Sequence, residues 1–296
     1  MKHPIVYSAG QASLLGNRRN NQDRCALITS DDSILLALGD GMGGHPKGEM
    51  AAQILIDICR QRLADAHGPV TEPRTFLSGV LDQAHDAIRH YGRQQSPAID
   101  PRTTAVVALI QDGMVHWIHA GDSRFYLFRS GEILTRTQDH SYVERLRQQG
   151  IITEQQLDNH PHRNYVTRCL GGSGALPTAT LGKRILAAGD RLLLCSDGLW
   201  GSLDEALMID ALFSSMSPAE AAEALAEEAA QAAFPESDNV TLLTLKIEAL
   251  PTTAQVTPLP PQEQPPAASE NELDLAIAEL QNAITSFNSQ IDQEKK

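Results

Sequence analysis

Residues 36–52 read LALGDGMGGHPKGEMAA and combine three local patterns. The apolar run at 34–38 predicts a buried strand, and the apolar spacing from Glu49 onward predicts a helix. The glycines between them allow a sharp turn and let other groups approach the backbone closely. The stretch therefore predicts a strand, a tight turn and a helix, with Asp40 at the end of the strand. A single Asp-Gly pair also has a purely structural interpretation, because Asp side chains often hydrogen-bond a turn backbone.

Other acidic residues are placed in the same way. Strands are predicted at 25–29, 34–38, 104–110, 114–120, 124–129, 191–195 and 240–247. The acids at their ends are Asp23, Asp40, Asp122, Asp197 and Asp238. Tight turns put such residues on a sheet rim, where several carboxylates repel one another unless cations lie between them. Mg²⁺ and Mn²⁺ prefer oxygen ligands, and two such ions can support an in-line displacement at phosphorus.

Arg18 lies five residues before Asp23 in the stretch RRNNQD. A guanidinium beside a metal cluster can hold a phosphate with a fork of hydrogen-bond donors. An arginine next to another arginine is otherwise a solvated basic turn. The acids nearby favour the phosphate-binding interpretation.

Composition narrows the choice of partners. The chain has 296 residues, a net charge of −13, 42% hydrophobic residues and only 4% aromatic residues. The acidic balance and the few aromatic residues argue against a nucleic-acid partner. The four cysteines are scattered without a C-x-x-C pair, which indicates neither a zinc knuckle nor a thioredoxin-type motif. No signal peptide and no apolar run of about 20 residues is visible, so we expect a cytoplasmic protein without a membrane span.

The chain divides into a main unit and a tail. Residues 1–248 alternate strands with helices predicted at 51–64, 73–91, 142–149 and 218–233, and tight turns between strands predict antiparallel sheets in an α+β fold. Residues 249–269 are a Pro/Gln-rich linker, and residues 293–296 are a polar end. Between them, residues 270–292 place apolar side chains in a heptad pattern, which predicts an amphipathic helix. That helix docks on a protein partner, folds back on the main unit, or stays disordered.

Seven segments together resemble the type 2C family of metal-dependent serine/threonine protein phosphatases, in its bacterial form. They are RRNNQD (18–23), GDGMGGH (39–45), TTA (103–105), AGDSR (120–124), DHS (139–141), SDGL (196–199) and DNVT (238–241). Their order and approximate spacing match the family over roughly residues 5 to 248. The resemblance implies a β-sandwich of two antiparallel sheets flanked on both sides by helices, in four α-β-β-α layers.

The resemblance also implies a site. Two Mn²⁺ or Mg²⁺ ions would be held by four aspartates and the Gly41 carbonyl, and a third, weaker ion by Asp122 with Asp197. The four aspartates are Asp23, Asp40, Asp197 and Asp238. Arg18 would orient the substrate phosphate. A metal-bridging hydroxide would attack phosphorus directly, without a phosphoenzyme, on phosphoserine or phosphothreonine of protein substrates. The enzyme would oppose a Ser/Thr kinase.

The chain departs from the family pattern at two positions. Met42 stands where many eukaryotic relatives carry a His proposed as the general acid, and Gln22 stands where other relatives have Glu. His45 is a candidate acid in this chain because a histidine titrates near neutral pH. The alternatives are that His45 only hydrogen-bonds the turn and that a metal-bound water suffices.

Residues 141–174 correspond to the variable flap of the family and contain Arg145, Arg147, Arg163 and Arg168. A cationic rim of this kind suits phosphorylated protein substrates, although an ordinary solvated loop has the same composition. His160 and His162 form an H-x-H pair without further soft ligands nearby, which makes zinc a weak hypothesis. The alternatives to a phosphatase are a catalytically weak regulatory binding module with a C-terminal docking helix and another two-metal hydrolase, such as a nuclease.

Overall fold

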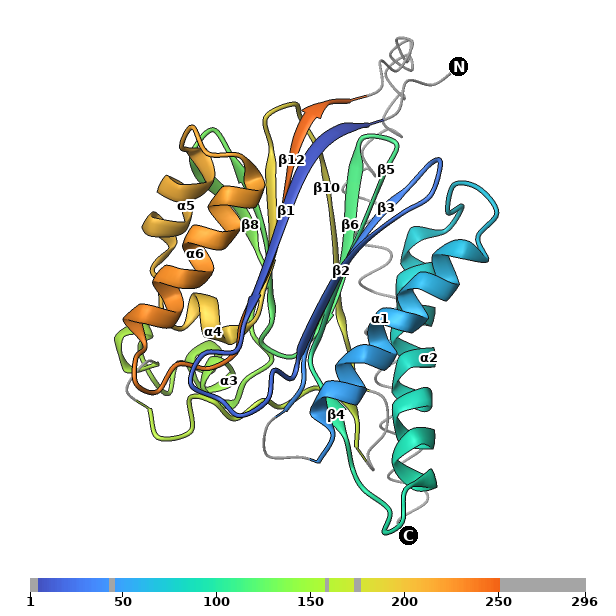
Figure 1. Ribbon diagram of the computed structural model, residues 1–296, viewed down its shortest axis with the longest axis vertical. Helices are drawn as coiled ribbons and strands as arrows, with labels where there is room; N and C mark the ends of the chain where they lie inside the picture. The colour runs from blue at the N-terminus through green and yellow to red at the C-terminus, as the bar shows by residue number, and fades with distance from the viewer. Residues whose placement is uncertain (1–4, 43–45, 158–159, 173–176, 251–296) are drawn as a thin grey trace, which may run out of the picture. The chain divides into compact units, whose positions relative to one another are not determined.

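Two five-stranded antiparallel sheets lie face to face and carry helices on their outer sides (Figure 1). The computed structural model describes residues 5–42, 46–157, 160–172 and 177–250. In spatial order the first sheet consists of β1 (Val6–Leu14), β12 (Val240–Ala249), β11 (Arg191–Cys195), β7 (Arg124–Arg129) and β8 (Glu132–Arg136). The second consists of β10 (Thr180–Ile185), β6 (Met114–Ala120), β5 (Ala105–Gln111), β3 (Ile34–Asp40) and β2 (Asp23–Thr29). A small sheet pairs β4 (Arg102–Thr103) with β9 (Leu170–Gly171).

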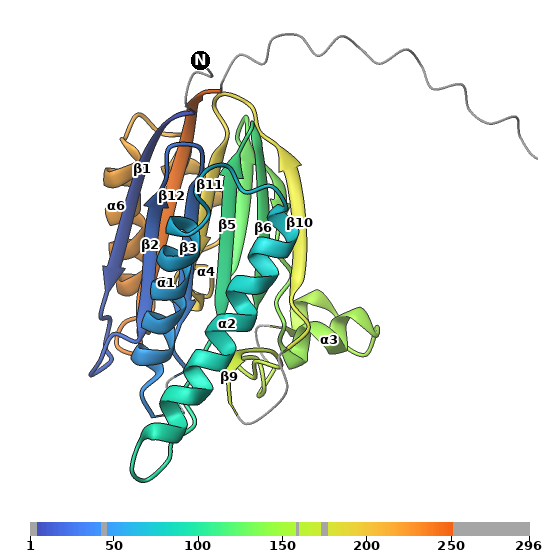
Figure 2. The same ribbon diagram turned by 90° about the vertical axis from the view of Figure 1, so that its right-hand side faces the viewer.

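Side chains alternate between the two faces of each strand, and this alternation builds the layers. In β3, Leu36 and Leu38 pack between the sheets, where they meet Leu243 of β12. Leu35 points the other way, into the apolar layer under α1 (Gly48–Ala64) and α2 (Pro73–Gln94). Figure 2 shows α1 and α2 lying over the second sheet.

A third apolar layer lies on the outer face of the first sheet. It consists of buried side chains from that sheet and from α4 (Asp197–Trp200), α5 (Glu205–Phe213) and α6 (Pro218–Ala232). Helix α6 begins with a capping box in which Ser217 and Glu220 satisfy each other's backbone N–H groups. The predicted α+β sandwich with helices on both sides is therefore confirmed.

The sequence patterns placed most elements correctly and missed those with weak periodicity. β2 begins at Asp23 and β3 ends at Asp40. These two acids are therefore the end residues of their strands, whereas the sequence patterns placed them just outside the strands. The edge strands β1 and β10 were not predicted, because all of their residues are exposed or only partly buried and their apolar alternation is weak. The short helices α4 and α5 were missed as well. The remaining elements are α3 (Tyr142–Gln148) and a 3₁₀ turn at Glu154–Gln156.

Several predicted features lie outside the described residues. They are His45, most of the linker at 249–269, the helix at 270–292 and the end at 293–296. These stay predictions. Within the described part of the chain, no helix combines the length and the apolar character needed to cross a membrane.

Gly10 allows α6 to lie directly on β1. A Cβ atom at Gly10 would come within 2.3 Å of the Pro218 carbonyl oxygen and 2.4 Å of the Ala219 Cα atom, both of which are backbone. We expect Gly10→Ala to lower the free energy of unfolding by about 1–3 kcal/mol. In a domain of this size each kcal/mol corresponds to a fall in Tm of about 2–4 °C, measured by circular dichroism.

Gly79→Ala is the matched control. At Gly79 in α2 the added Cβ would meet only the end of the flexible Arg62 side chain, at 2.6 Å. Alanine also favours a helix over glycine by about 1 kcal/mol, so the Tm should stay the same or rise. Equal melting of Gly10→Ala and the unchanged protein would refute the close-packing argument.

Candidate metal centre

Strand register brings the first two acids together. β2 and β3 are antiparallel, and their ladder pairs Asp23 with Asp40. The first residue of one strand therefore lies opposite the last residue of the other, at one rim of the second sheet. The backbone of Asp40 is fixed there by Thr103 of β4 and by Thr104, which lies between β4 and β5. Its N–H donates to the Thr104 hydroxyl at 2.9 Å, and its carbonyl accepts from the Thr103 hydroxyl at 3.0 Å.

The first sheet contributes two more acids at the adjoining rim. β11 ends at Cys195, which pairs with Leu242 near the start of β12. Asp197 follows β11 as the first residue of α4, and Asp238 lies two residues before Val240, where β12 begins. The Ser196 hydroxyl donates to Oδ2 of Asp23 at 2.8 Å and so joins the rims of the two sheets.

Asp122 completes the group from the connection between β6 and β7, which crosses from the second sheet to the first. Burial is the largest cause that raises the pKa of Asp40 well above its ordinary value. The next causes are the charges of the other four acids, Asp23, Asp197, Asp122 and Asp238. Asp40 therefore lies close enough to each of the other four predicted aspartates for their charges to act on it.

Burial also perturbs the carboxyl groups of Asp23 and Asp197. Burial is the main cause that raises the pKa of Asp23 to about 7, and hydrogen bonds from Ser196 and Thr241 offset part of this effect. Burial and then the charge of Asp238 raise the pKa of Asp197 to about 6. Asp23 is only 2% exposed, and its Oδ1 atom has no hydrogen-bond partner among the described residues. A buried carboxylate oxygen without a partner is costly unless a cation or a proton meets it.

The residues fit hard divalent cations. The converging donors are carboxylate oxygens, which Mg²⁺ and Mn²⁺ prefer over softer metals. In the described ranges, no three histidine, cysteine or acidic side chains already surround one point as a closed set of ligands. An open arrangement suits these ions, because Mg²⁺ is usually bound through one or two carboxylates and keeps several waters.

Gly41 lies where the turn after β3 packs against the start of α1. A Cβ atom at Gly41 would come within 2.4 Å of the carbonyl carbon of Gly48, so only glycine fits. Its N–H donates to the Gln22 carbonyl at 3.2 Å. The role of the Gly41 carbonyl as a metal ligand stays a prediction.

Arg18 lies at the mouth of the acidic group. Its Nη2 atom donates to Oδ2 of Asp238 at 2.7 Å, while its side chain is 55% exposed. A cavity of about 580 Å³ opens here between Arg18, Arg19, Asp40, Lys47 and Asp238, among other residues. An exposed ion pair of this kind contributes little to stability, so Arg18 is available to a ligand in the cavity.

Two supporting residues had no role in the sequence-based prediction. Ser196 binds Asp23, as described above. Asn239 accepts a hydrogen bond from the Gln22 N–H at 2.8 Å and donates to the Leu15 carbonyl at 2.9 Å, which fixes the segment that carries Arg18. Both lie inside the quoted SDGL and DNVT stretches, but only their acids carried a recognisable chemical signal.

The arginines of the predicted flap are not equivalent. Arg147 forms a two-pronged ion pair with Glu144 at 2.7 and 2.8 Å, so its charge is compensated. Arg145 lies over the Tyr142 ring at 5.4 Å, and Arg168 donates to the Thr178 carbonyl.

The rings of His160 and His162 lie 5.7 Å apart beside Tyr142, in an aromatic cluster rather than a closed metal site among the described residues.

The raised pKa of Asp23 predicts how the metal-free protein responds to pH. The folded protein keeps a proton on Asp23 up to about pH 7, whereas the unfolded chain releases it near the ordinary value of 3.8. The free energy of unfolding therefore falls as the pH rises through this window, by an amount of the order of a few kcal/mol. We expect Asp23→Asn to remove this dependence and to raise the metal-free Tm at pH 8, while Mn²⁺ raises it less than in the unchanged protein.

The measurement is thermal unfolding at pH 5.5 and pH 8, with a chelator and with Mn²⁺, for both proteins. The quantity compared is the difference between the two proteins, because it removes the contribution of titrating groups that do not interact with Asp23. A metal-free Asp23→Asn protein that is less stable than the unchanged protein at pH 8 would contradict the assigned desolvation of Asp23.

The chain was compared with families, curated proteins and solved structures. The model of the family described as protein phosphatase 2C matches residues 11–231. The serine/threonine protein phosphatase PstP of Mycobacterium tuberculosis is 36% identical over 234 residues, which cover 78% of this chain and 43% of PstP. The chain thus spans less than half the length of that relative.

Solved structures agree with this relationship. Serine/threonine phosphatase Stp1 from Staphylococcus aureus superposes with a TM-score of 0.77 at 28% identity, covering 84% of this chain and 98% of Stp1. The catalytic domain of PstP, solved in complex with two manganese ions, superposes with a TM-score of 0.70 at 32% identity, covering 83% of this chain and all of that domain (100%).

Proposed function

This chain belongs to the protein phosphatase 2C family, and from that premise we propose that it removes phosphate from phosphoserine and phosphothreonine of proteins in a metal-dependent reaction. The observation that carries the proposal is the convergence of five aspartates from both sheets on one rim, where Oδ1 of Asp23 is buried without a partner among the described residues. The manganese ions reported for the PstP catalytic domain support the choice of Mn²⁺ or Mg²⁺.

We assign each of the five aspartates a role as a metal ligand. Asp23, Asp40, Asp197 and Asp238 would hold two ions, with the Gly41 carbonyl as a further ligand, and Asp122 with Asp197 would hold a third, weaker ion. When bound, such ions supply the charge that activates a water molecule and stabilises the phosphoryl group during an in-line displacement.

The protein side chains bind and orient the substrate. Arg18, which contacts Asp238 in the structure, would turn its guanidinium to the phosphate, for which its fork of donors is suited, and would leave Asp238 to bind a cation. The cavity beside it admits an extended phosphopeptide rather than a buried small molecule, because it opens at the surface between exposed residues. His45 stays a candidate proton donor, and a water molecule is the alternative.

The substrate chemistry implies partners. Phosphoserine and phosphothreonine exist only where a kinase has made them, so we place the enzyme in the cytoplasm as the counterpart of a Ser/Thr kinase. The flap residues Arg145 and Arg168, for which the described part of the chain shows no ion pair, would meet acidic groups of the substrate protein. The heptad helix at 270–292 would bind a further protein. A binding module without turnover is disfavoured, because all five acids are present and converge.

The test is phosphate release from a phosphothreonine peptide with Mn²⁺ and with a chelator. Release that needs Mn²⁺ is expected. Absence of release with saturating Mn²⁺, from a protein whose Tm nevertheless rises with Mn²⁺, would favour the binding module. Release of nucleotides from DNA or RNA under the same conditions would favour a nuclease.

A further inference from the structure

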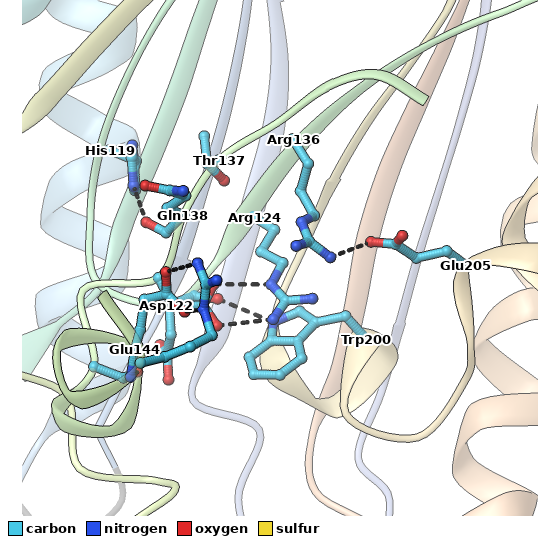
Figure 3. Close-up of polar contacts among 12 residues, drawn as sticks. His119, Asp122, Arg124, Arg136, Thr137, Gln138, Glu144, Trp200 and Glu205 are labelled. Atoms are coloured by element: carbon cyan, nitrogen blue, oxygen red, sulfur yellow. Dashed lines mark hydrogen bonds and ion pairs between the residues drawn. The ribbon is translucent and has the colours of Figure 1, made fainter. Parts of the chain in front are cut away.

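Arg124 joins three segments beside the acidic group. It is the first residue of β7, and its Nε and Nη2 atoms donate to the two carboxylate oxygens of Asp139, each at 2.8 Å. Its guanidinium lies over the Trp200 ring at 3.5 Å, and Figure 3 shows the two side by side. The side chains of Arg124 and Asp139 are only 15% and 12% exposed. We call Arg124, Asp139 and Trp200 the arginine clamp.

The clamp connects the segments that carry two of the acids. The indole Nε1 of Trp200 donates to the backbone carbonyl of Asp122 at 2.9 Å. Trp200 is the last residue of α4, which begins at Asp197, and Arg124 lies two residues after Asp122. One hydrogen bond and one stacked contact therefore fix the segment of Asp122 against the segment of Asp197.

Hydrogen bonds on both sides of Asp139 hold its segment in place. The segment that carries it is tied to β7 because Thr137 N–H donates to the Phe125 carbonyl and the Phe125 N–H donates to the Thr137 hydroxyl, both at 3.0 Å. The next residue, His140, donates its N–H to the Gly121 carbonyl at 2.9 Å. The segment that carries the Asp139 carboxylate is therefore held by hydrogen bonds on both sides of Asp139.

Asp139 also balances the positive charge of Arg124. A buried arginine beside Asp122 and Asp197 would be drawn to their carboxylates and would compete with a cation for them. Asp139 accepts both prongs of the guanidinium and keeps it in the plane of the Trp200 stack. The two carboxylates that face the metal centre stay available to an ion.

We propose that Arg124, Asp139 and Trp200 are positioning residues that set the separation of Asp122 from Asp197, and thereby the affinity of the ion that these two aspartates hold. This inference rests on the proposed metal-dependent function. The residues touch neither the substrate nor the ion, and they act through the backbone of the two acids. Residues that orient metal ligands in this way typically change metal affinity about 10–100-fold when they are replaced.

The same strand contains a matched control. At the far end of β7, Arg129 donates to both oxygens of Asp190 at 2.7 and 2.8 Å, and Asp190 is fully buried (0% exposed). This pair has the same forked ion-pair geometry as Arg124 and Asp139, but it does not contact the acidic group. Arg129→Lys therefore measures what the loss of a forked ion pair does to the fold alone.

Trp200 provides a direct readout of the ion. The chain has two tryptophans, and Trp117 is replaced by Phe so that only Trp200 fluoresces. Mn²⁺ is a paramagnetic quencher, and Trp200 bonds the carbonyl of Asp122 and ends the helix that begins at Asp197. Quenching therefore reports Mn²⁺ at the acidic group, and the midpoint compared is that of the phase at the highest Mn²⁺ concentration, because the ion of Asp122 and Asp197 is proposed to be the weakest. The experiment titrates Mn²⁺ into Trp117→Phe alone and in combination with Arg124→Lys, Asp139→Asn, both together, or Arg129→Lys.

We expect Arg124→Lys and Asp139→Asn each to raise the Mn²⁺ midpoint at least about 10-fold. The double variant should add little, because the two residues act as one unit. Arg129→Lys should lower the Tm and leave the midpoint within twofold. A midpoint that Arg124→Lys and Asp139→Asn leave unchanged, or that Arg129→Lys shifts equally, would overturn the inference. If Arg124→Lys does not fold, Asp139→Asn alone decides.

Phosphate release on the same proteins separates this inference from the proposed function. With the clamp intact, failure to release phosphate despite Mn²⁺ quenching would count against the function and leave the clamp standing if the midpoints shift as expected. Normal phosphate release at unchanged midpoints in the clamp variants would refute the clamp and leave the function standing.

Discussion

Asp40→Asn is expected to lower Mn²⁺-dependent phosphate release from a phosphothreonine peptide about 1,000-fold, which corresponds to about 4 kcal/mol of lost transition-state stabilisation. Asp40 lies at the centre of the acidic group, since the charges of the four other aspartates all act on its pKa. Asparagine keeps the size of the side chain and removes the negative charge that balances the cations. Asp197→Asn should have an effect of the same order, because Asp197 would contact the core ions and the third ion.

The control for this prediction is Asp190→Asn. Asp190 is buried and bound by Arg129, and it lies just before β11, beside the end of β7 that is far from Asp122. Its replacement should lower the Tm and leave phosphate release nearly unchanged. Thermal unfolding with added Mn²⁺ supplies a second readout, since Asp40→Asn should lose most of the Mn²⁺-induced rise in Tm. Phosphate release that survives in both Asp40→Asn and Asp197→Asn would place the active site elsewhere.

The candidate site could be predicted from the sequence because its acids stand at strand ends. A run of apolar residues predicts a strand, and an acid next to the end of a strand lies at the rim of the sheet. Which rims meet could not be predicted from periodicity. The opposition of Asp23 and Asp40 follows from register, and the approach of Asp197 to Asp23 depends on packing of one sheet on the other. The family resemblance supplied that convergence, and the structure shows it.

The features that the sequence did not reveal depend on pairings far apart in the chain. β1 pairs with β12 across more than 220 residues, and β10 pairs with β6 across a long connection. The arginine clamp has the same character, because Asp139 and Trp200 reach Arg124 from separate segments. Nothing local distinguishes Trp200 from an ordinary core aromatic residue. Its hydrogen bond to Asp122 is visible only in three dimensions.

Arg18→Ala is expected to lower kcat/KM for a phosphothreonine peptide about 100-fold, or about 3 kcal/mol, mostly through KM. Arg18 contacts Asp238 with one nitrogen atom and keeps most of its side chain exposed at the cavity, so a phosphate can reach its remaining donors. Arg18→Lys should recover only part of the loss, since an ammonium group cannot offer the planar fork that matches a phosphate.

Arg19→Ala is the matched control, because Arg19 lines the same cavity and carries the same charge without an ion pair to an acid among the described residues. We expect its kcat/KM to stay within about threefold of the unchanged protein, since a general loss of positive charge at an exposed rim is screened by salt. The Mn²⁺ midpoint should barely change in Arg18→Ala, because Asp238 keeps its place at the start of β12. Equal losses in the two variants would show that positive charge at the cavity, and not a specific guanidinium fork at Arg18, holds the substrate.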